Sequence, residues 1–197
     1  PSVIYCDVTG HTGSGFKLWG GAEPAIYRCN ITGNGVGVEM WADTSNRRIK
    51  RNRATIENCV VAGNRFEGIF GGLPTVTNST IADNLGHGLS CISPTITGSI
   101  IYFNNAGLDN LVSTQSATVS YSDVQGGATG PGNIDADPLF RVPGAWSDVY
   151  DLRAAWTPGD YHLKSQGWAW NSLQGDWTWD EVTSPCIDAG DPSLPLG

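Results

Sequence analysis

Four side chains could contact a sugar together if the stretches that carry them are neighbouring strands. Lys17 and Trp19 lie in GFKLW, and Glu39 and Trp41 occupy the same positions in GVEMW. On adjacent strands in register, the members of each pair point outward, one above the other. Stacked exposed tryptophans suit the faces of sugar rings, and a Lys–Glu pair offers polar contacts at one edge. The alternative is that a neighbouring loop covers both tryptophans, which then only pack.

The loop after the second stretch, residues 42–53, holds five of the eleven basic residues of the chain. They are Arg47, Arg48, Lys50, Arg51 and Arg53. Guanidinium groups pair with carboxylate or sulfate through two parallel hydrogen bonds. The sequence therefore predicts an anionic polysaccharide as the ligand. The alternative is a solvated loop, or one that docks on the acidic C-terminal part of the chain.

The carboxylates near this loop are too few to predict catalysis. Acid–base cleavage of a glycosidic bond needs a pair of carboxyl groups. Glu39 and Glu67 are the candidates near the loop, and the Asp residues of the first 115 positions are scattered singly. We assign no catalytic residue and expect a protein that binds rather than cleaves. The alternative is a fragment of a polysaccharide lyase or glycoside hydrolase that acts on the same anionic polysaccharide.

A repeat of twenty residues must position these side chains. ATIENCVVAGN begins at residue 54, PTVTNSTIADN at residue 74 and PTITGSIIYFN at residue 94. A fixed period of this length is typical of a solenoid, in which each unit buries its apolar side against its neighbours. Each unit predicts two short strands separated by a bend, and a Gly-led apolar piece supplies a third. Leucine-rich repeats share the spacing, but Leu is absent from the aligned columns, so the sequence predicts an all-β parallel β-helix.

The register extends to about six coils, and one of its columns predicts a ladder of buried amides. This ladder consists of Asn34, Asn64, Asn84 and Asn104. Stacked identical amides satisfy one another and the backbone of the turns at every step. Cys6, Cys29 and Cys59 share another inward column. We expect free thiols there, because side chains on successive parallel coils are poorly aimed for a disulfide.

The net charge of −8 is unevenly distributed along the 197 residues. Residues 1–115 carry eight Lys/Arg and eight Asp/Glu, whereas residues 116–197 carry three and eleven. This distribution argues against a general binder of nucleic acid or of anionic membranes. The sequence has no apolar run of transmembrane length and no His/Cys spacing typical of metal sites. We therefore expect no nucleic-acid partner, no membrane insertion and no cofactor.

From Ser116 the character of the sequence changes, and three phrases stand out. They are NIDADPLF at Asn133–Phe140, DYHLKS at Asp160–Ser165 and SPCIDAGDP at Ser184–Pro192. After repeats that end in an asparagine ladder, these phrases resemble the C-terminal part of secreted bacterial right-handed β-helix proteins of the pectin-lyase-like superfamily. The resemblance covers nearly the whole chain. It implies a right-handed parallel β-helix in an extracellular or cell-surface setting, but no reaction.

Six of the eight tryptophans of the chain lie in this C-terminal part. They are Trp146, Trp156, Trp168, Trp170, Trp177 and Trp179. WAW and WTW predict a β-hairpin with four tryptophans on one face. We expect residues 1–140 to form the coils and residues 141–197 an irregular Trp-rich cap, with this face over the open end or side of the helix. The alternative is a free face that docks a sugar or a protein.

One further motif concerns a metal. Asn133, Asp135 and Asp137 alternate as Ca²⁺ ligands sometimes do, although Asp-Pro phrases also serve simply as turns. Ca²⁺ is therefore an alternative to the expectation that the protein holds no metal.

The first residue, Pro1, falls at the start of a coil with no cap before it. Since solenoids need polar ends to stay soluble, we expect the chain to be a fragment of a longer one. The alternative is that the open first coil associates with another copy, as a closed dimer or a filament. These features together predict a non-catalytic extracellular segment of a larger secreted or surface protein, with a structural or carbohydrate-facing role.

Overall fold

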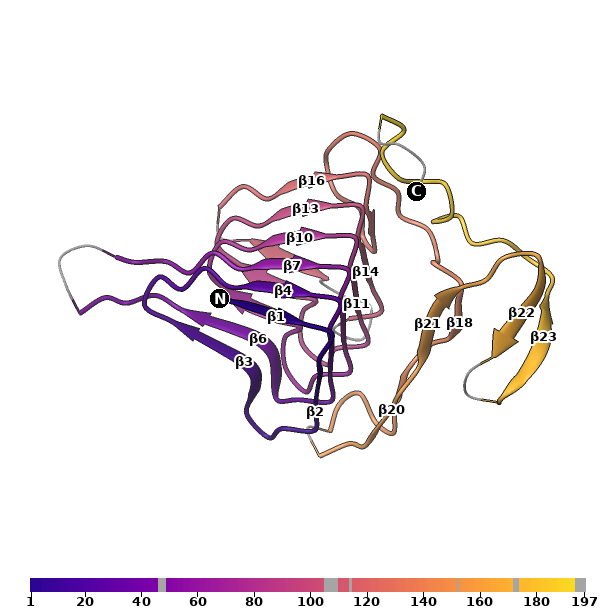
Figure 1. Cartoon of the computed structure of the whole chain (residues 1–197), viewed down its shortest axis with the longest axis horizontal. Helices are drawn as coiled ribbons and strands as arrows, with labels where there is room; N and C mark the ends of the chain where they lie inside the picture. The colour runs from indigo at the N-terminus through magenta and orange to yellow at the C-terminus, as the bar shows by residue number, and fades with distance from the viewer. Residues whose placement is uncertain (46–48, 105–109, 114, 152, 172–173, 194–197) are drawn as a thin grey trace.

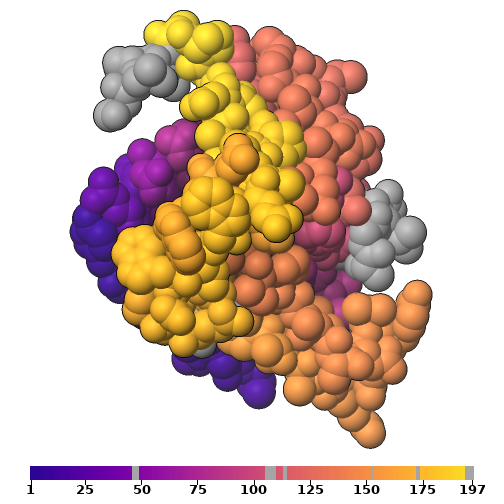
Figure 2. Space-filling model, turned by 90° about the vertical axis from the view of Figure 1, so that its right-hand side faces the viewer, coloured from indigo at the N-terminus to yellow at the C-terminus, as the bar shows by residue number. Residues whose placement is uncertain are grey.

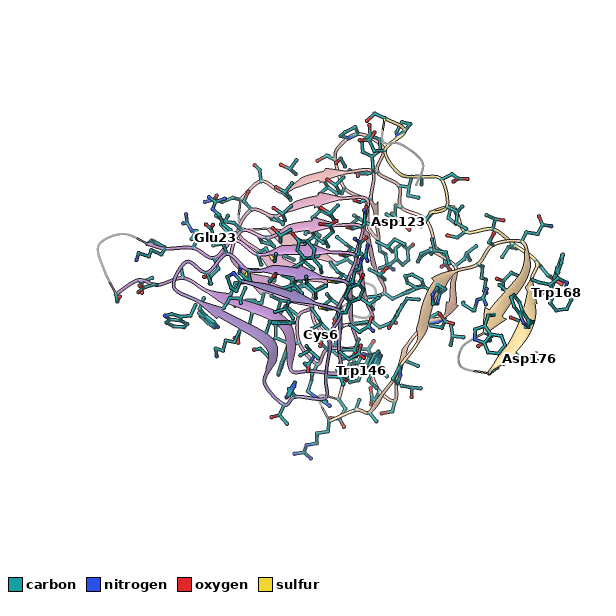
Figure 3. The ribbon with its side chains drawn as sticks, in the orientation of Figure 1. Cys6, Glu23, Asp123, Trp146, Trp168 and Asp176 are labelled. Carbon is teal, nitrogen blue, oxygen red and sulfur yellow. The ribbon has the colours of Figure 1, made fainter. Side chains whose placement is uncertain are left out.

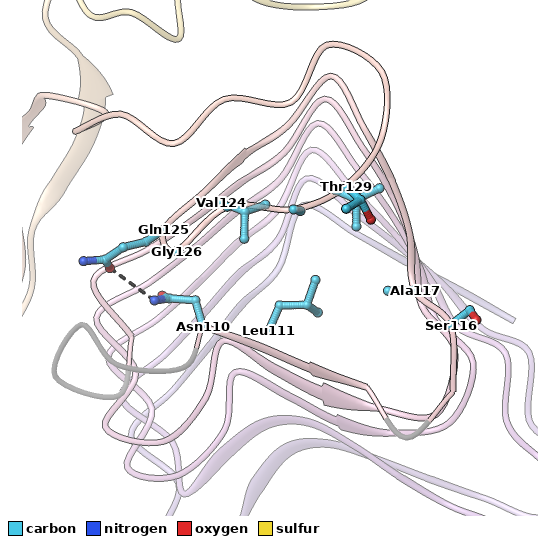
Figure 4. Close-up of a pocket in the computed structure, with 11 residues that line it drawn as sticks. Asn110, Leu111, Ser116, Ala117, Val124, Gln125, Gly126 and Thr129 are labelled. Atoms are coloured by element: carbon cyan, nitrogen blue, oxygen red, sulfur yellow. Dashed lines mark hydrogen bonds between the residues drawn. The ribbon is translucent and has the colours of Figure 1, made fainter.

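The computed structural model describes residues 1–45, 49–104, 110–113, 115–151, 153–171 and 174–193. The described residues form strands and loops, with no helix and hence none that could span a membrane. Three parallel sheets wrap around one apolar core and make a stack of coils with a triangular cross-section (Figures 1 and 4). The fold is the expected parallel β-helix.

The three sheets of the coil stack run along its length, and each coil contributes at most one strand to each sheet. The first sheet contains β1 (Ser2–Ile4), β4 (Ala25–Tyr27), β7 (Thr55–Glu57), β10 (Thr75–Thr77), β13 (Thr95–Thr97) and β16 (Thr118–Ser120). The second sheet contains β2 (Asp7–Thr9), β5 (Asn30–Thr32), β8 (Val60–Ala62), β11 (Thr80–Ala82), β14 (Ile100–Tyr102) and β17 (Asp123–Val124). The third sheet contains β3 (Ser14–Trp19), β6 (Val36–Trp41), β9 (Ile69–Gly71), β12 (Leu89–Cys91) and β15 (Leu111–Ser113). Five coils therefore reach all three sheets, and the sixth contributes only to the first two within the described residues.

The repeated sequence explains why the coils stack in register. In the first sheet, Ile56 pairs with Val76 and Val76 with Ile96, and all three side chains are fully buried. One residue between the first and second sheets has a positive φ in every coil, which turns the chain sharply with no helix or long loop. These residues are Tyr5, Arg28, Asn58, Asn78, Gly98 and Tyr121. Each unit therefore repeats both the inward apolar positions and the bend.

The predicted asparagine ladder is confirmed. The side-chain oxygen of Asn84 accepts from the backbone nitrogen of Asn64 at 2.9 Å and from its amide nitrogen at 2.8 Å. The Asn84 amide nitrogen donates to Val61 O at 3.1 Å and to Asn104 Oδ1 at 2.7 Å. The ladder continues to Asn110, whose side-chain oxygen accepts from the Asn104 backbone nitrogen at 2.9 Å. All its members are buried, so every coil satisfies polar groups of the next.

A second ladder follows the column of small residues. The backbone nitrogen of Cys59 donates to Ser79 Oγ at 3.1 Å, and that of Ser79 donates to Ser99 Oγ at 3.2 Å. The Cys29 backbone nitrogen faces the Cys59 sulfur at 3.4 Å. All five cysteines of the chain are free thiols, as expected for the inward column.

The two ends of the coil stack are less well covered than its middle. At the C-terminal end, a hollow of about 420 Å³ is lined by apolar side chains such as Leu111 and Val124 and by polar ones such as Asn110 (Figure 4). Asn110 donates to Gln125 at 3.2 Å across one side of this end. At the other end, Val3 and Cys6 of the first coil are only partly buried. Association through the first coil stays a prediction.

Residues 137–193, which we call the C-terminal segment, form three antiparallel strand pairs. They are β18 (Phe140–Val142) with β21 (Asp160–Leu163), β19 (Ala145–Trp146) with β20 (Trp156–Thr157), and β22 (Gly167–Asn171) with β23 (Asp176–Asp180). The segment runs beside the second sheet rather than across the end of the stack (Figures 1 and 2). The segment therefore lies along the side of the stack, but the expectation that the four tryptophans of its hairpin cover the stack is wrong, because all four are exposed.

Single contacts attach the C-terminal segment to the second sheet and its following turns. The Asp83 carboxylate accepts from the Gly144 backbone nitrogen at 2.8 Å and from the Tyr161 hydroxyl at 2.7 Å. The ring of Trp156 lies against Gly63, where a Cβ would come within 2.0 Å of the ring. Since Gly63 also has a φ of +61°, a larger residue there would strain the turn and displace the ring.

Candidate functional site

The outer face of the third sheet carries the pairs that the sequence predicts. Lys17 is the register partner of Glu39 and Trp19 is that of Trp41, on β3 and β6. Trp19 is 62% exposed and Trp41 43% exposed, so a large part of each residue faces solvent. The structure thus brings the four side chains together on one solvent-facing surface.

The aromatic surface extends one coil further than the sequence indicates. Phe70, on β9, is the register partner of Glu39, and its ring centroid lies 5.7 Å from that of Trp41 with the planes tilted by 56°. We call Trp19, Trp41 and Phe70 the aromatic face. Sequence reasoning missed Phe70 because the short GIF segment reveals its outward-facing neighbour only when β6 and β9 are placed side by side.

The Lys17–Glu39 pair gives the aromatic face a polar edge. Lys17 Nζ lies 3.4 Å from Glu39 Oε2, and the Ser14 hydroxyl donates to the same oxygen. Partial burial raises the pKa of Glu39, but hydrogen bonds, chiefly from Ser14, and the Lys17 charge outweigh it. The pKa of Glu39 therefore lies below its usual value, and the carboxyl group is ionised at neutral pH. Its charge is balanced locally by Lys17, whose side chain is 62% exposed and free to contact a ligand.

One buried side chain, Asn52, fixes the basic loop to the sheet. Its amide nitrogen donates to Leu18 O at 3.1 Å and to Trp41 O at 2.8 Å. Its oxygen accepts from the backbone nitrogens of Gly21 at 2.8 Å and Ala22 at 2.6 Å. Because the Asn52 amide donates both of its hydrogens and its oxygen accepts twice, this side chain connects the ends of β3 and β6. Its position outside the repeat gave no sequence signal.

The loop presents its described basic side chains to solvent. Asp43 and Lys50 form an antiparallel bridge through backbone bonds of 3.0 and 3.1 Å, and Lys50, Arg51 and Arg53 are all exposed. Arg51 also lines a small hollow of about 240 Å³ together with Phe70. Arg47 and Arg48, which the sequence places in the same basic cluster, lie outside the described residues.

The carboxyl groups with raised pKa values lie on another side of the molecule. Burial raises the pKa of Asp83 to about 6, although hydrogen bonds from Tyr161 and Gly144 oppose this. Burial also raises the pKa of Asp123, which accepts from the Cys186 thiol at 3.0 Å. Both lie under the C-terminal segment beside the second sheet, where they hold that segment in place.

The segment that holds Asn133, Asp135 and Asp137, the candidate Ca²⁺ ligands of the sequence analysis, makes turn contacts in the structure. Asn133 accepts from the Ser122 backbone nitrogen at 3.1 Å and donates to Val119 O at 3.1 Å. Asp137 accepts from the Leu139 backbone nitrogen at 2.9 Å. Within the described residues, no group of three or more His, Cys, Asp or Glu side chains is arranged to hold a metal ion.

Comparison with known families decides the classification. The model of the right-handed β-helix region matches residues 1–136, more than half of the chain. The chain belongs to the right-handed β-helix family. The matched residues end within the NIDADPLF phrase, so the other two C-terminal phrases lie outside the match. Searches of curated proteins and of solved structures found no match.

Proposed function

We propose that this β-helix binds an anionic polysaccharide without cleaving it, through the aromatic face and the basic loop beside it. The protein would serve as a carbohydrate-facing segment of a larger secreted or surface protein. The observation that carries the proposal is the register of two exposed tryptophans, Trp19 and Trp41, next to exposed basic side chains on an acidic protein. The right-handed β-helix fold is compatible with a structural or carbohydrate-related role.

The aromatic face supplies contact area for sugar rings. Tryptophan offers a large rigid surface with little side-chain entropy to lose on binding. The third sheet holds Trp19 and Trp41 on consecutive strands, which lie about 4.8 Å apart in a sheet. This spacing lets one short stretch of polysaccharide cross both rings.

The charges around the aromatic face favour an acidic sugar. Glu39 is already paired with Lys17, whereas Lys50, Arg51 and Arg53 are exposed. Arginine recognises carboxylate and sulfate through a planar fork of N–H donors. The buried Asn52 between Arg51 and Arg53 fixes the backbone that carries both guanidinium groups.

Calorimetry with short oligogalacturonates and sulfated oligosaccharides tests the proposal. Binding should appear at low salt and weaken as salt is added, because exposed charges are screened. Trp19→Ala with Trp41→Ala should abolish it. Arg51→Ser with Arg53→Ser should weaken it about tenfold, the effect of losing roughly 1.4 kcal/mol. Arg153→Ser, which removes an exposed arginine of the C-terminal segment, is the matched control and should bind normally.

Two results would count against the proposal. Absence of binding to both kinds of acidic oligosaccharide at low salt would reject the anionic ligand. Release of shortened or unsaturated sugars during the titration would instead identify the alternative, a polysaccharide lyase or glycoside hydrolase.

A further inference from the structure

The hairpin of β22 and β23 exposes four tryptophans on one face. Trp168 pairs with Trp179 and Trp170 with Trp177 across the two strands. The ring centroids of these pairs are 5.7 and 6.0 Å apart, and the ring planes meet at 79° and 71°. All four residues are between 52% and 67% exposed. This Trp face is therefore a solvent-exposed aromatic surface and does not cover the core of the coil stack.

A buried ion pair holds the hairpin from its opposite side. Arg141, on β18, lies 2.7 Å from the Asp180 carboxylate, and the two side chains are only 6% and 8% exposed. Arg141 also donates to Trp170 O. Because successive residues of a strand point to opposite faces, Asp180 lies on the face away from Trp179. The anchor leaves the Trp face free, and Figure 3 shows Trp168 at the outer edge of the molecule.

The charge around the Trp face is negative. Residues 165–197 contain five Asp/Glu and no Lys, Arg or His. Glu181, which follows β23, is exposed and lies on the side of Trp179 by the alternation of the strand. Asp176, at the start of β23, is also exposed but lies on the opposite side together with Asp180, which is neutralised by Arg141. Aromatic ring faces attract cations, and nearby carboxylates add to that attraction. The surface is therefore complementary to a ligand that carries several positive charges.

A second copy of the chain fits this surface less well. At about 150–250 Å² for a fully buried aromatic side chain, four half-exposed tryptophans offer about 350–600 Å² per copy. Two such faces would bury about 700–1,200 Å² in total, at or below the lower limit for a stable interface. The symmetric contact would also bring the acidic hairpins of both copies together, which costs free energy.

We propose that the Trp face binds a polysaccharide with free amino groups, in which ammonium groups are attached to successive sugar rings. Such a ring supplies a positive charge for the tryptophan faces and carboxylates, and apolar C–H groups for the edge-to-face rings. Its ammonium group is fixed on a rigid ring, whereas a lysine side chain must lose rotamer entropy on binding. This inference does not depend on the aromatic face of the third sheet.

Calorimetry with a glucosamine hexamer and an N-acetylglucosamine hexamer, in mildly acidic buffer, tests the inference. The glucosamine hexamer should bind at least about tenfold more tightly, because acetylation removes the charge that the rings attract. Its binding should weaken as salt is added.

Two variants separate the contributions of rings and charges. Trp170→Thr with Trp177→Thr should abolish binding while leaving the melting of the coil stack unchanged. Glu181→Gln keeps every ring and should weaken binding about threefold, whereas Asp176→Asn, on the opposite side of the hairpin, should change it less. Glu181→Gln decides the test if loss of two rings disorders the hairpin. Trp19→Ala, on the third sheet, is the control and should bind the glucosamine hexamer normally.

Several results would overturn the inference. Equal binding of both hexamers would show neutral sugar stacking, and equal binding of an oligolysine would show recognition of a cationic peptide. A dimer in sedimentation analysis that the Trp170→Thr, Trp177→Thr variant abolishes would identify a second copy as the occupant. Absence of binding of the glucosamine hexamer at low salt would also reject the inference.

Discussion

The coil stack and the C-terminal segment are held together in different ways. In the coil stack, Asn64, Asn84 and Asn104 make nearly the same hydrogen bonds, with lengths that vary by only a few tenths of an ångström. In the C-terminal segment, each anchor occurs once, such as the Asp83–Tyr161 bond and the Arg141–Asp180 pair. Removal of a ladder residue should therefore disturb coils on both sides, whereas removal of one anchor should affect only its own surroundings.

The two regions also differ in the charge around their exposed tryptophans. On the third sheet, Trp19 and Trp41 lie beside exposed Lys and Arg side chains. On the hairpin, the four tryptophans are carried by strands whose exposed charged side chains, Asp176 and Glu181, are both acidic. Similar aromatic surfaces should then select ligands of opposite charge.

The largest effect on stability is expected for Asn84→Ala, in the coil stack. The change removes four hydrogen bonds: the buried Asn64 backbone nitrogen loses its side-chain acceptor, and Val61 O and Asn104 Oδ1 each lose a donor. At about 1–3 kcal/mol for each unsatisfied buried group, the free energy of unfolding should fall by several kcal/mol. Denaturant unfolding measures this loss, with Thr95→Ala on the exposed side of β13 as a control that should change little. An Asn84→Ala melting temperature equal to that of the unchanged protein would disprove the role of the ladder.

The next largest effect concerns pH and the anchor of the C-terminal segment at Asp83. Burial raises the pKa of Asp83 to about 6, whereas the unfolded chain has a value of about 3.9. The folded protein therefore binds this proton more tightly, and its stabilising effect is fully present below about pH 4 and is lost as the pH rises through 6. A shift of about two units corresponds to about 2–3 kcal/mol.

Asp83→Asn should remove this pH dependence, because the amide does not titrate and still accepts from Gly144 and Tyr161. The check is the free energy of unfolding between pH 4 and pH 7, measured for both proteins. Identical pH profiles would contradict the role assigned to Asp83.

A smaller effect is expected for Asn52→Ala, which breaks an irregular anchor of the coil stack. The Gly21 and Ala22 backbone nitrogens lose their acceptor, but they lie near the surface, where water can replace it. We expect a loss of about 1–2 kcal/mol in stability. Binding of acidic oligosaccharides should weaken as well, because the backbone between Arg51 and Arg53 is no longer held. Unchanged affinity together with reduced stability would show that the basic loop is not part of the binding site.

The smallest effect is expected for Lys17→Met at the edge of the aromatic face. The Lys17–Glu39 pair is 3.4 Å long, and the lysine is mostly exposed, so stability should change by less than about 0.5 kcal/mol. Affinity for an acidic ligand should fall about threefold, since one exposed positive charge is lost. Calorimetry and thermal unfolding of the same sample measure both quantities. A large loss of stability would mean that the pair maintains the fold and not the ligand surface.

The periodic part of the fold could be predicted from the sequence because each coil repeats the same constraints. The columns of Ile56 and Asn64 predict the inward positions, and the alignment of GFKLW with GVEMW predicts the outward pairs, Lys17 with Glu39 and Trp19 with Trp41. The family match and the register of the strands confirm the parallel β-helix, and the hydrogen bonds between the stacked amides confirm the asparagine ladder.

Features that occur once could not be predicted in the same way. Asn52 lies in an irregular loop, and its four partners come together only when β3 and β6 are adjacent. The hairpin itself could be predicted from WAW and WTW. The exposure of its Trp face could not, because it depends on Arg141 holding the opposite side, and no sequence pattern links Arg141 to Asp180. Anion binding at the third sheet and cation binding at the hairpin stay predictions.

The most direct test of anion binding at the third sheet uses the eight indole N–H signals of the protein in an NMR titration with oligogalacturonate. Single Trp→Phe variants assign each signal. The signals of Trp19 and Trp41 should move as ligand is added, and those of the six C-terminal tryptophans should stay in place. Movement confined to Trp168, Trp170, Trp177 and Trp179, or no movement of Trp19 and Trp41 at saturating ligand, would contradict the assignment of the polysaccharide site to the third sheet.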